Sequence, residues 1–142
     1  MKDAIRSVGA VVAGFVVLSI LISIWAAVVP AVWRDLGMRP DGSLITPPPD
    51  HIAFKVEMIV NIVVAAVAGW LCARLAGHHP AFHVAALGAI MLSLSAAYAL
   101  RIAGASFSAA KPAWAHLGTA LGLVVGLSLG VFIHLRTVRA PA

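Results

Sequence analysis

The sequence is short of charged residues and holds a single cysteine. Only 11% of its 142 residues are charged, whereas about a quarter of the residues in soluble domains are charged. Cys72 has no second cysteine to pair with, which excludes an intramolecular disulfide and any CxxC redox or zinc motif. The basic residues lie at the ends of apolar segments instead of in one patch, so nucleic acid is not an expected partner.

Hydrophobic residues make up 62% of the chain. Four apolar runs are each long enough to cross a hydrocarbon core about 30 Å thick. The first run follows Lys2 and Arg6 and is far longer than the apolar core of a signal peptide, so it is expected to be an uncleaved span. We predict one all-α membrane domain, an antiparallel bundle of four transmembrane helices in the lipid bilayer. The expected helices lie at about 7–33, 56–76, 81–104 and 113–135, with an outer loop at 34–55.

Four spans place both termini on one side of the membrane. Lysine and arginine are divided evenly between the two sides, so their count does not set the orientation. We expect both termini to be cytoplasmic because Lys2 and Arg6 directly precede the first apolar run, whose flank often dominates orientation. The loop at 34–55, with its three consecutive prolines and its acids, is typical of an exported connector.

The last span carries a glycine at every fourth position: Gly118, Gly122, Gly126 and Gly130. In a water-soluble helix each of these would cost about 1 kcal/mol relative to alanine. In a bilayer they form a flat stripe along which another helix can approach closely. Two interpretations stay open: a glycine zipper between copies of the chain, or packing against the first or third helix of the same chain.

The second and third spans carry similar ladders of small residues. Spacing of four relates Ala65 to Gly69 in the second span and Ala89 to Ser93 in the third. Together with the short links between helices, these ladders predict a closely packed antiparallel bundle.

One group of polar residues is a candidate site near the outer face. Glu57 and Arg101 are expected at similar depths, with Asn61 and Tyr98 about one turn deeper. Such a group would suit a small anion or a proton relay, because ionisable residues at membrane depth usually face a partner or a cavity. A structural ion pair, or an arginine reaching the headgroups, is the favoured alternative. No acid lies in the middle of a span, which argues against a proton-coupled exporter.

Histidines gather near the opposite face. His78, His79 and His83 lie close in sequence, with His134 and Cys72 expected at the same face. Imidazole and thiolate groups bind zinc or copper, but Pro80 interrupts the spacing, and no metal site is expected. Haem between two histidines is not expected either, because every histidine lies at the end of a span, but the pairing of His83 with His134 stays open.

The stretch Gly69–Ala76, followed by Pro80, His83, Leu87 and Gly88, carries a family resemblance. It resembles small four-helix bacterial inner-membrane proteins, which often have a Gly-aromatic-x-x-Ala-Arg-Leu-Ala stretch across the hairpin of helices 2 and 3. The group has no established activity. The resemblance therefore implies a bacterial inner-membrane location and a four-span architecture only.

The functional expectation is a structural or accessory membrane subunit without enzymatic activity or cofactor. It would assemble through small-residue helix faces, as a homo-oligomer or within a larger membrane complex. The alternative is a small-molecule or ion transporter or channel with its polar site near the outer face. A membrane-embedded enzyme is the third hypothesis.

Overall fold

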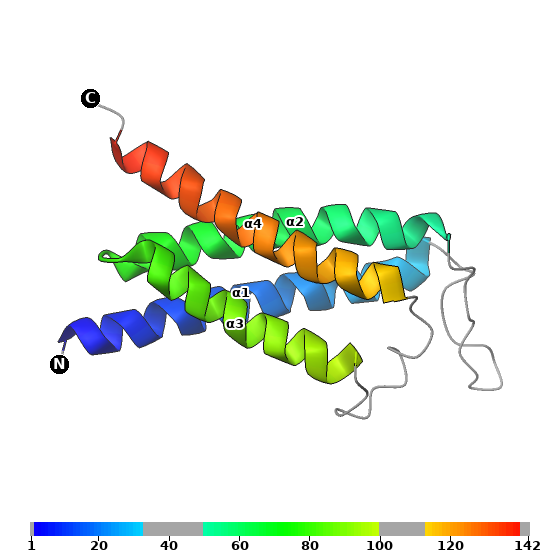
Figure 1. The fold of residues 1–142 in the computed structure, drawn as a ribbon, viewed down its shortest axis with the longest axis horizontal. Coiled ribbons are helices and arrows are strands. Elements are labelled where there is room, and N and C mark those ends of the chain that lie inside the picture. The colour runs from blue at the N-terminus through cyan, green and yellow to red at the C-terminus, as the bar shows by residue number, and fades with distance from the viewer. Residues whose placement is uncertain (1, 33–49, 100–112, 140–142) are drawn as a thin grey trace.

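The computed structural model describes residues 2–32, 50–99 and 113–139, and these form four α-helices. All four are long and apolar enough to cross a membrane, so the predicted all-α, four-span fold class is confirmed. Figure 1 shows both chain ends and the α2–α3 turn at one end of the bundle, here called the terminal end. The opposite end is called the loop end. The helices are α1 (Lys2–Val32), α2 (Ile52–Ala76), α3 (Pro80–Ala99) and α4 (Ala113–Arg139).

Three helices extend beyond the apolar runs that predicted them. α1 begins at Lys2 instead of residue 7, α2 begins at Ile52 instead of residue 56, and α4 continues to Arg139 instead of residue 135. Backbone hydrogen bonding does not stop where hydrophobicity stops, so charged flanks can continue a helix into the headgroup region. The start of α2 is capped, because His51 Nδ1 accepts a hydrogen bond from the Ala53 backbone N–H at 3.1 Å.

The turn between α2 and α3 is tight, as its sequence predicted. Gly77 and His79 both have positive φ angles, of 74° and 46°, and Pro80 opens α3 in the position where a missing N–H is tolerated. Arg6 reaches this turn from α1, and its Nε donates to the Leu75 carbonyl oxygen at 3.0 Å. That bond satisfies one of the carbonyls left unpaired at the end of α2.

The core is built mostly from small side chains. α2 packs against α4 on one side and α1 on the other. α3 contacts each of the other three helices. At Gly14 an added Cβ would lie 3.1 Å from the Cβ of Cys72 and within 2.8 Å of Leu87, so α1 meets both α2 and α3 there. The core cluster includes Ala10, Leu18, Ala65, Ala68, Cys72, Ala73, Ala76, Val84, Leu87, Met91, Leu123 and Leu127.

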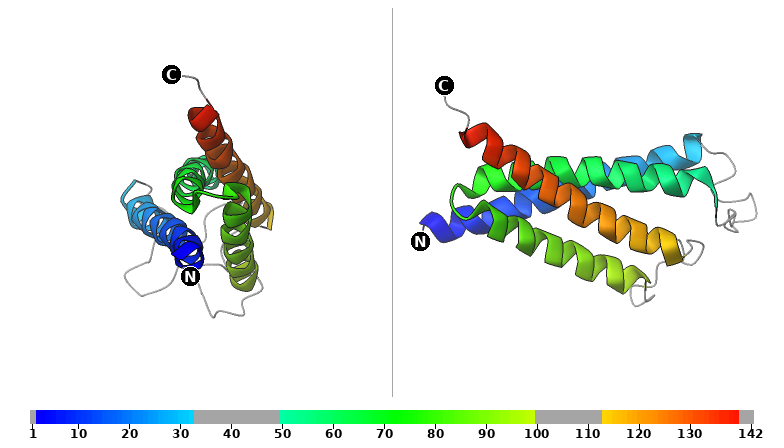
Figure 2. Two further views of the ribbon diagram at one scale, coloured as in Figure 1. Left: turned by 90° about the vertical axis from the view of Figure 1, so that its left-hand side faces the viewer. Right: turned by 45° about the horizontal axis from the view of Figure 1, so that its top comes forward.

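Packing is closer at the terminal end than at the loop end. The buried residues of α1 all lie in its first half, at Ala10, Gly14 and Leu18, and no described side chain after Leu18 in this helix is buried. Figures 1 and 2 show α3 drawing away from α2 as both leave their common turn. Large apolar side chains cover the outside of the bundle, as expected for a surface in contact with lipid.

Candidate functional site

The glycine stripe of α4 lies directly on the backbone of α2. A Cβ added at Gly126 would meet the Ile62 carbonyl oxygen and would come within 2.7 Å of the Ala65 Cβ. A Cβ added at Gly130 would meet the Ala66 carbonyl oxygen. Real Cβ atoms essentially never come closer than 3.0 Å to such neighbours, so only glycine fits at these two positions.

The contact is reciprocal on α2. A Cβ added at Gly69 would lie 2.8 Å from the Leu127 carbonyl oxygen and 3.0 Å from its Cα. Ala65 and Gly69 are both buried in this interface. The two predicted ladders of α2 and α4 therefore face each other, and the backbones meet through them.

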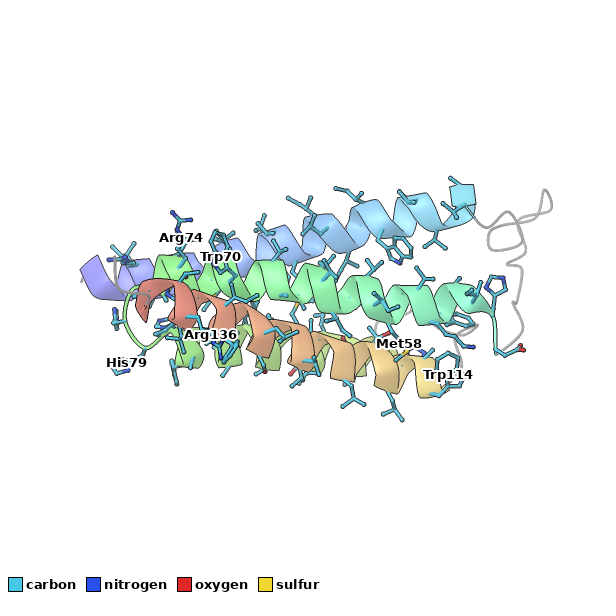
Figure 3. All side chains as sticks on the ribbon, turned by 90° about the horizontal axis from the view of Figure 1, so that it is seen from above. Met58, Trp70, Arg74, His79, Trp114 and Arg136 are labelled. Carbon is cyan, nitrogen blue, oxygen red and sulfur yellow. The ribbon has the colours of Figure 1, made fainter. Side chains whose placement is uncertain are left out.

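The backbones of α2 and α4 lie farther apart toward the loop end. At Gly122 an added Cβ would lie 3.3 Å from Ile62 Cγ1 and from the Met58 carbonyl oxygen. At Gly118 the nearest atoms belong to the flexible Met58 side chain, whose sulfur would lie 2.5 Å away. Figure 3 places Met58 at the loop end beside Trp114. One methionine thus fills the space that opens as the two backbones separate.

These contacts change one expectation from the sequence. The within-chain partner of the glycine stripe was expected to be the first or third helix, and it is α2. All four glycines are buried within one chain, so a seam between copies can no longer rest on them. Spacing showed that a close approach was available but not which of three other helices would make it.

The small-residue ladder of α3, unlike those of α2 and α4, is not buried between helices. Ala85, Ala89 and Ser93 are exposed, and the Ser93 hydroxyl donates to the Ala89 carbonyl oxygen at 2.8 Å. α3 packs into the bundle through another face, which includes Leu87 and Met91. Of the eight residues expected to pack helices, Ala89 and Ser93 are the two that lie on the outside of the chain.

The structure describes only part of the candidate polar group. Asn61 is buried, and its Nδ2 donates to the Glu57 backbone oxygen one turn earlier at 2.9 Å. Its Cβ lies 3.9 Å from where a Cβ of Gly122 would be, so the amide belongs to the α2–α4 interface. Glu57 is half-buried. The Tyr98 side chain and all of Arg101 lie outside the described residues.

Hydroxyl groups in α4 also donate to backbone carbonyl oxygens of their own helix. Thr119 donates to the Ala115 carbonyl oxygen and Ser128 to that of Val124, each at 2.8 Å. Together with Asn61, these side chains use acceptors one turn back in their own helices. Such bonds lower the free energy of burying a polar group in a span without needing a second helix.

Three histidines, His78, His79 and His83, lie together at the α2–α3 turn. His78 lies edge-on to His79 and to His83, with ring centroids 5.9 Å and 5.7 Å apart. His83 is buried, and its Nδ1 lies 3.0 Å from the His79 backbone oxygen. Within residues 2–32, 50–99 and 113–139, no group of three His, Cys, Asp or Glu side chains could hold a metal ion.

Two arginines at the terminal end lie over aromatic rings. The Arg74 guanidinium carbon is 5.2 Å from the centre of the Trp70 ring, and that of Arg136 is 4.4 Å from the Phe132 ring. Figure 3 shows both arginines at the end that also carries His79. Both pairs were missed from the sequence, although in each an aromatic residue stands four positions before an arginine, a spacing that indicates such a contact on a helix.

Comparisons with protein families, with curated proteins and with solved structures find no match to this chain. The resemblance noted for the α2–α3 hairpin is therefore supported at the level of architecture alone, by four long apolar helices.

Proposed function

We propose that the protein is a structural or accessory membrane subunit that forms a homodimer through α3. The observation that carries this proposal is the exposed face formed by Ala85, Ala89 and Ser93. Small side chains at spacing four allow two membrane helices to approach closely and gain van der Waals contact. On α4 an equivalent stripe is already covered by α2, whereas on α3 the chain leaves it open.

A second copy of the chain is the partner that best fits this face. Two copies inserted in the same orientation present their α3 helices parallel and at the same depth. A two-fold axis along the membrane normal then brings each stripe against its own equivalent. The Ser93 hydroxyl does not oppose this contact, because it is bonded to its own helix.

The inner-membrane location and the cytoplasmic placement of both termini also belong to this proposal. Lys2 and Arg6 precede the first span, and Arg74 and Arg136 lie at the same end of the bundle. We expect a thiol probe that cannot cross membranes to label a cysteine added after Ala142 only once the cells are permeabilised. Labelling of intact cells would contradict the orientation but leave the dimer untouched.

A small transporter or channel is the weaker proposal. It needs polar side chains that face a pathway, whereas Asn61, Thr119 and Ser128 donate to carbonyl oxygens of their own helices.

Cysteine crosslinking in native membranes tests the dimer. In a Cys72→Ser background, Ala89→Cys places a thiol on the α3 face, and Leu121→Cys places one on an exposed position of α4 as the matched control. We expect oxidation to convert Ala89→Cys to a covalent dimer and to leave Leu121→Cys monomeric, because a disulfide needs Cβ atoms about 4 Å apart. The dimer proposal fails if both variants stay monomeric, if both crosslink equally, or if Ala89→Cys crosslinks only to a different protein.

A further inference from the structure

Three exposed arginines at the terminal end are each held in place by a contact other than a carboxylate. Arg6 is anchored through its Nε to the Leu75 carbonyl oxygen. Arg74 and Arg136 lie over the rings of Trp70 and Phe132. All three side chains are exposed, so each guanidinium is positioned by the fold while part of it still faces the surroundings.

Each of these contacts leaves hydrogen-bond donors for a ligand. A guanidinium has five N–H groups, and Arg6 uses its Nε–H on Leu75. Its terminal nitrogens lie beside Gly77, where an added Cβ would come within 2.8 Å of Nη2. For Arg74 and Arg136 the guanidinium carbon lies over an aromatic ring, and this contact does not require all five N–H groups.

The arginines of α2 and α4 lie at similar depth. Gly130 of α4 crosses α2 at Trp70, because a Cβ at Gly130 would lie 2.5 Å from the Trp70 backbone nitrogen. With a rise of about 1.5 Å per residue, Arg74 is about 6 Å and Arg136 about 9 Å beyond this crossing along their helices. Tryptophan is typical of the interface between hydrocarbon and headgroups, so both guanidinium groups lie at headgroup depth.

The charge at this end is one-sided. The terminal segments and the α2–α3 hairpin contribute Lys2, Arg6, Arg74, Arg136 and Arg139. Asp3 is the one acid in these parts of the sequence. The two acids whose side chains the structure describes, Asp50 and Glu57, lie at the start of α2, at the loop end.

Exposed apolar side chains precede the arginines in both helices and so lie on their membrane side. Val67 on α2 and Leu129, Phe132 and Ile133 on α4 are all exposed large hydrophobic residues. A ligand held by the guanidinium groups therefore has an apolar surface beside it on the membrane side. A phosphodiester with acyl chains fits both parts of this surface, whereas a free phosphate would use only the arginines.

We propose that Arg74 and Arg136, which project to different sides of the terminal end (Figure 3), each bind the phosphate of an anionic phospholipid, with Arg6 as a further cation at the α2–α3 turn. Guanidinium groups form paired hydrogen bonds to phosphate oxygens. The net negative charge of phosphatidylglycerol or cardiolipin adds attraction that a zwitterionic lipid lacks. This binding is independent of the α3 dimer, because none of its residues lies on α3.

Lipid titration by native mass spectrometry tests the site. The purified full chain in neutral detergent receives equal amounts of phosphatidylglycerol and phosphatidylcholine, and we expect retention of phosphatidylglycerol. Because each basic residue near an anionic lipid contributes about fivefold in affinity, each site of the double variant Arg74→Gln/Arg136→Gln should bind phosphatidylglycerol about fivefold more weakly. The matched control Lys55→Gln/Lys111→Gln removes the same charge from other positions and should bind like the unmodified protein.

The remaining outcomes separate the lipid site from its alternatives. Inorganic phosphate at the lipid concentration should not displace phosphatidylglycerol; full displacement would overturn the lipid proposal in favour of a free-phosphate site. Equal retention of phosphatidylcholine, or equal loss of binding in both double variants, would also overturn it. Both arginine side chains are exposed, and unchanged helix content and elution volume will show that the variant is folded.

Discussion

The glycine stripe of α4 and the small-residue stripe of α3 have the same spacing but different surroundings. Gly126 and Gly130 lie against the backbone of α2 with no room for a Cβ. Ala89 and Ser93 lie on the outside of the chain. A stripe of small residues thus indicates that a helix can be approached closely, whereas the arrangement of the other helices decides whether the approach occurs within the chain or from outside it.

The largest difference between the two stripes should appear when the same bulky residue is placed on each. We expect Gly126→Leu to destabilise the bundle by more than about 4 kcal/mol, because the side chain would meet the α2 backbone, which cannot move aside. Ala89→Leu should change the stability of the monomer by less than about 0.5 kcal/mol, since it adds surface facing outward. The rate of maleimide labelling at Cys72, which is fully buried, measures both. Similar rates in the two variants would contradict the difference.

A smaller change tests the gradient along α4. Gly126→Ala should destabilise the bundle by about 1–3 kcal/mol, because its Cβ would overlap backbone atoms of α2. Gly118→Ala should have an effect of less than about 1 kcal/mol, because the neighbouring atoms belong to the end of the Met58 side chain and can shift. Denaturant titration in detergent micelles measures the two. A larger loss at Gly118 would show that the helices approach most closely at the loop end.

The smallest effect concerns the contact that joins α1 to the α2–α3 turn. Arg6→Gln should lower stability by about 0.5–1.5 kcal/mol, the usual contribution of one hydrogen bond. The loss should be local, since Arg6 holds the first turns of α1 against Leu75. Hydrogen exchange should therefore quicken in the first half of α1 and at the α2–α3 turn and stay unchanged in α4. Faster exchange throughout the bundle would mean that Arg6 stabilises more than this contact.

Local features of the sequence were sufficient for the parts of the fold that depend on one helix at a time. Each span could be recognised because a run of about 20 apolar residues matches the hydrocarbon thickness. The α2–α3 turn was predictable from Gly77 and Pro80, since glycine permits the positive φ of a tight turn and proline fixes its own φ at the start of a helix. Helix ends were less accurate, because α1, α2 and α4 continue past their apolar runs.

The candidate site was harder to predict because it depends on several helices at once. Asn61 was assigned to a polar group with Tyr98 and Arg101, and this group stays a prediction because the Tyr98 side chain and Arg101 lie outside the described residues. The sequence did not indicate that the Asn61 amide lies in the α2–α4 interface and bonds to its own helix. Aromatic–arginine pairs were visible in the spacing, whereas the reach of Arg6 to Leu75 joins residues 69 positions apart.

The apolar runs are enough to establish four membrane-spanning helices, because hydrophobic length and backbone hydrogen bonding act within each segment. Glycine, alanine and serine at spacing four also show where another helix can approach closely. The pairing of α4 with α2, and the exposed position of the α3 stripe, depend on how the helices pack together in three dimensions. In a bilayer, lipid tails solvate an apolar side chain about as favourably as another helix does. The hydrophobic pattern therefore does not select which helices pair, and pairing depends on how well their surfaces fit together.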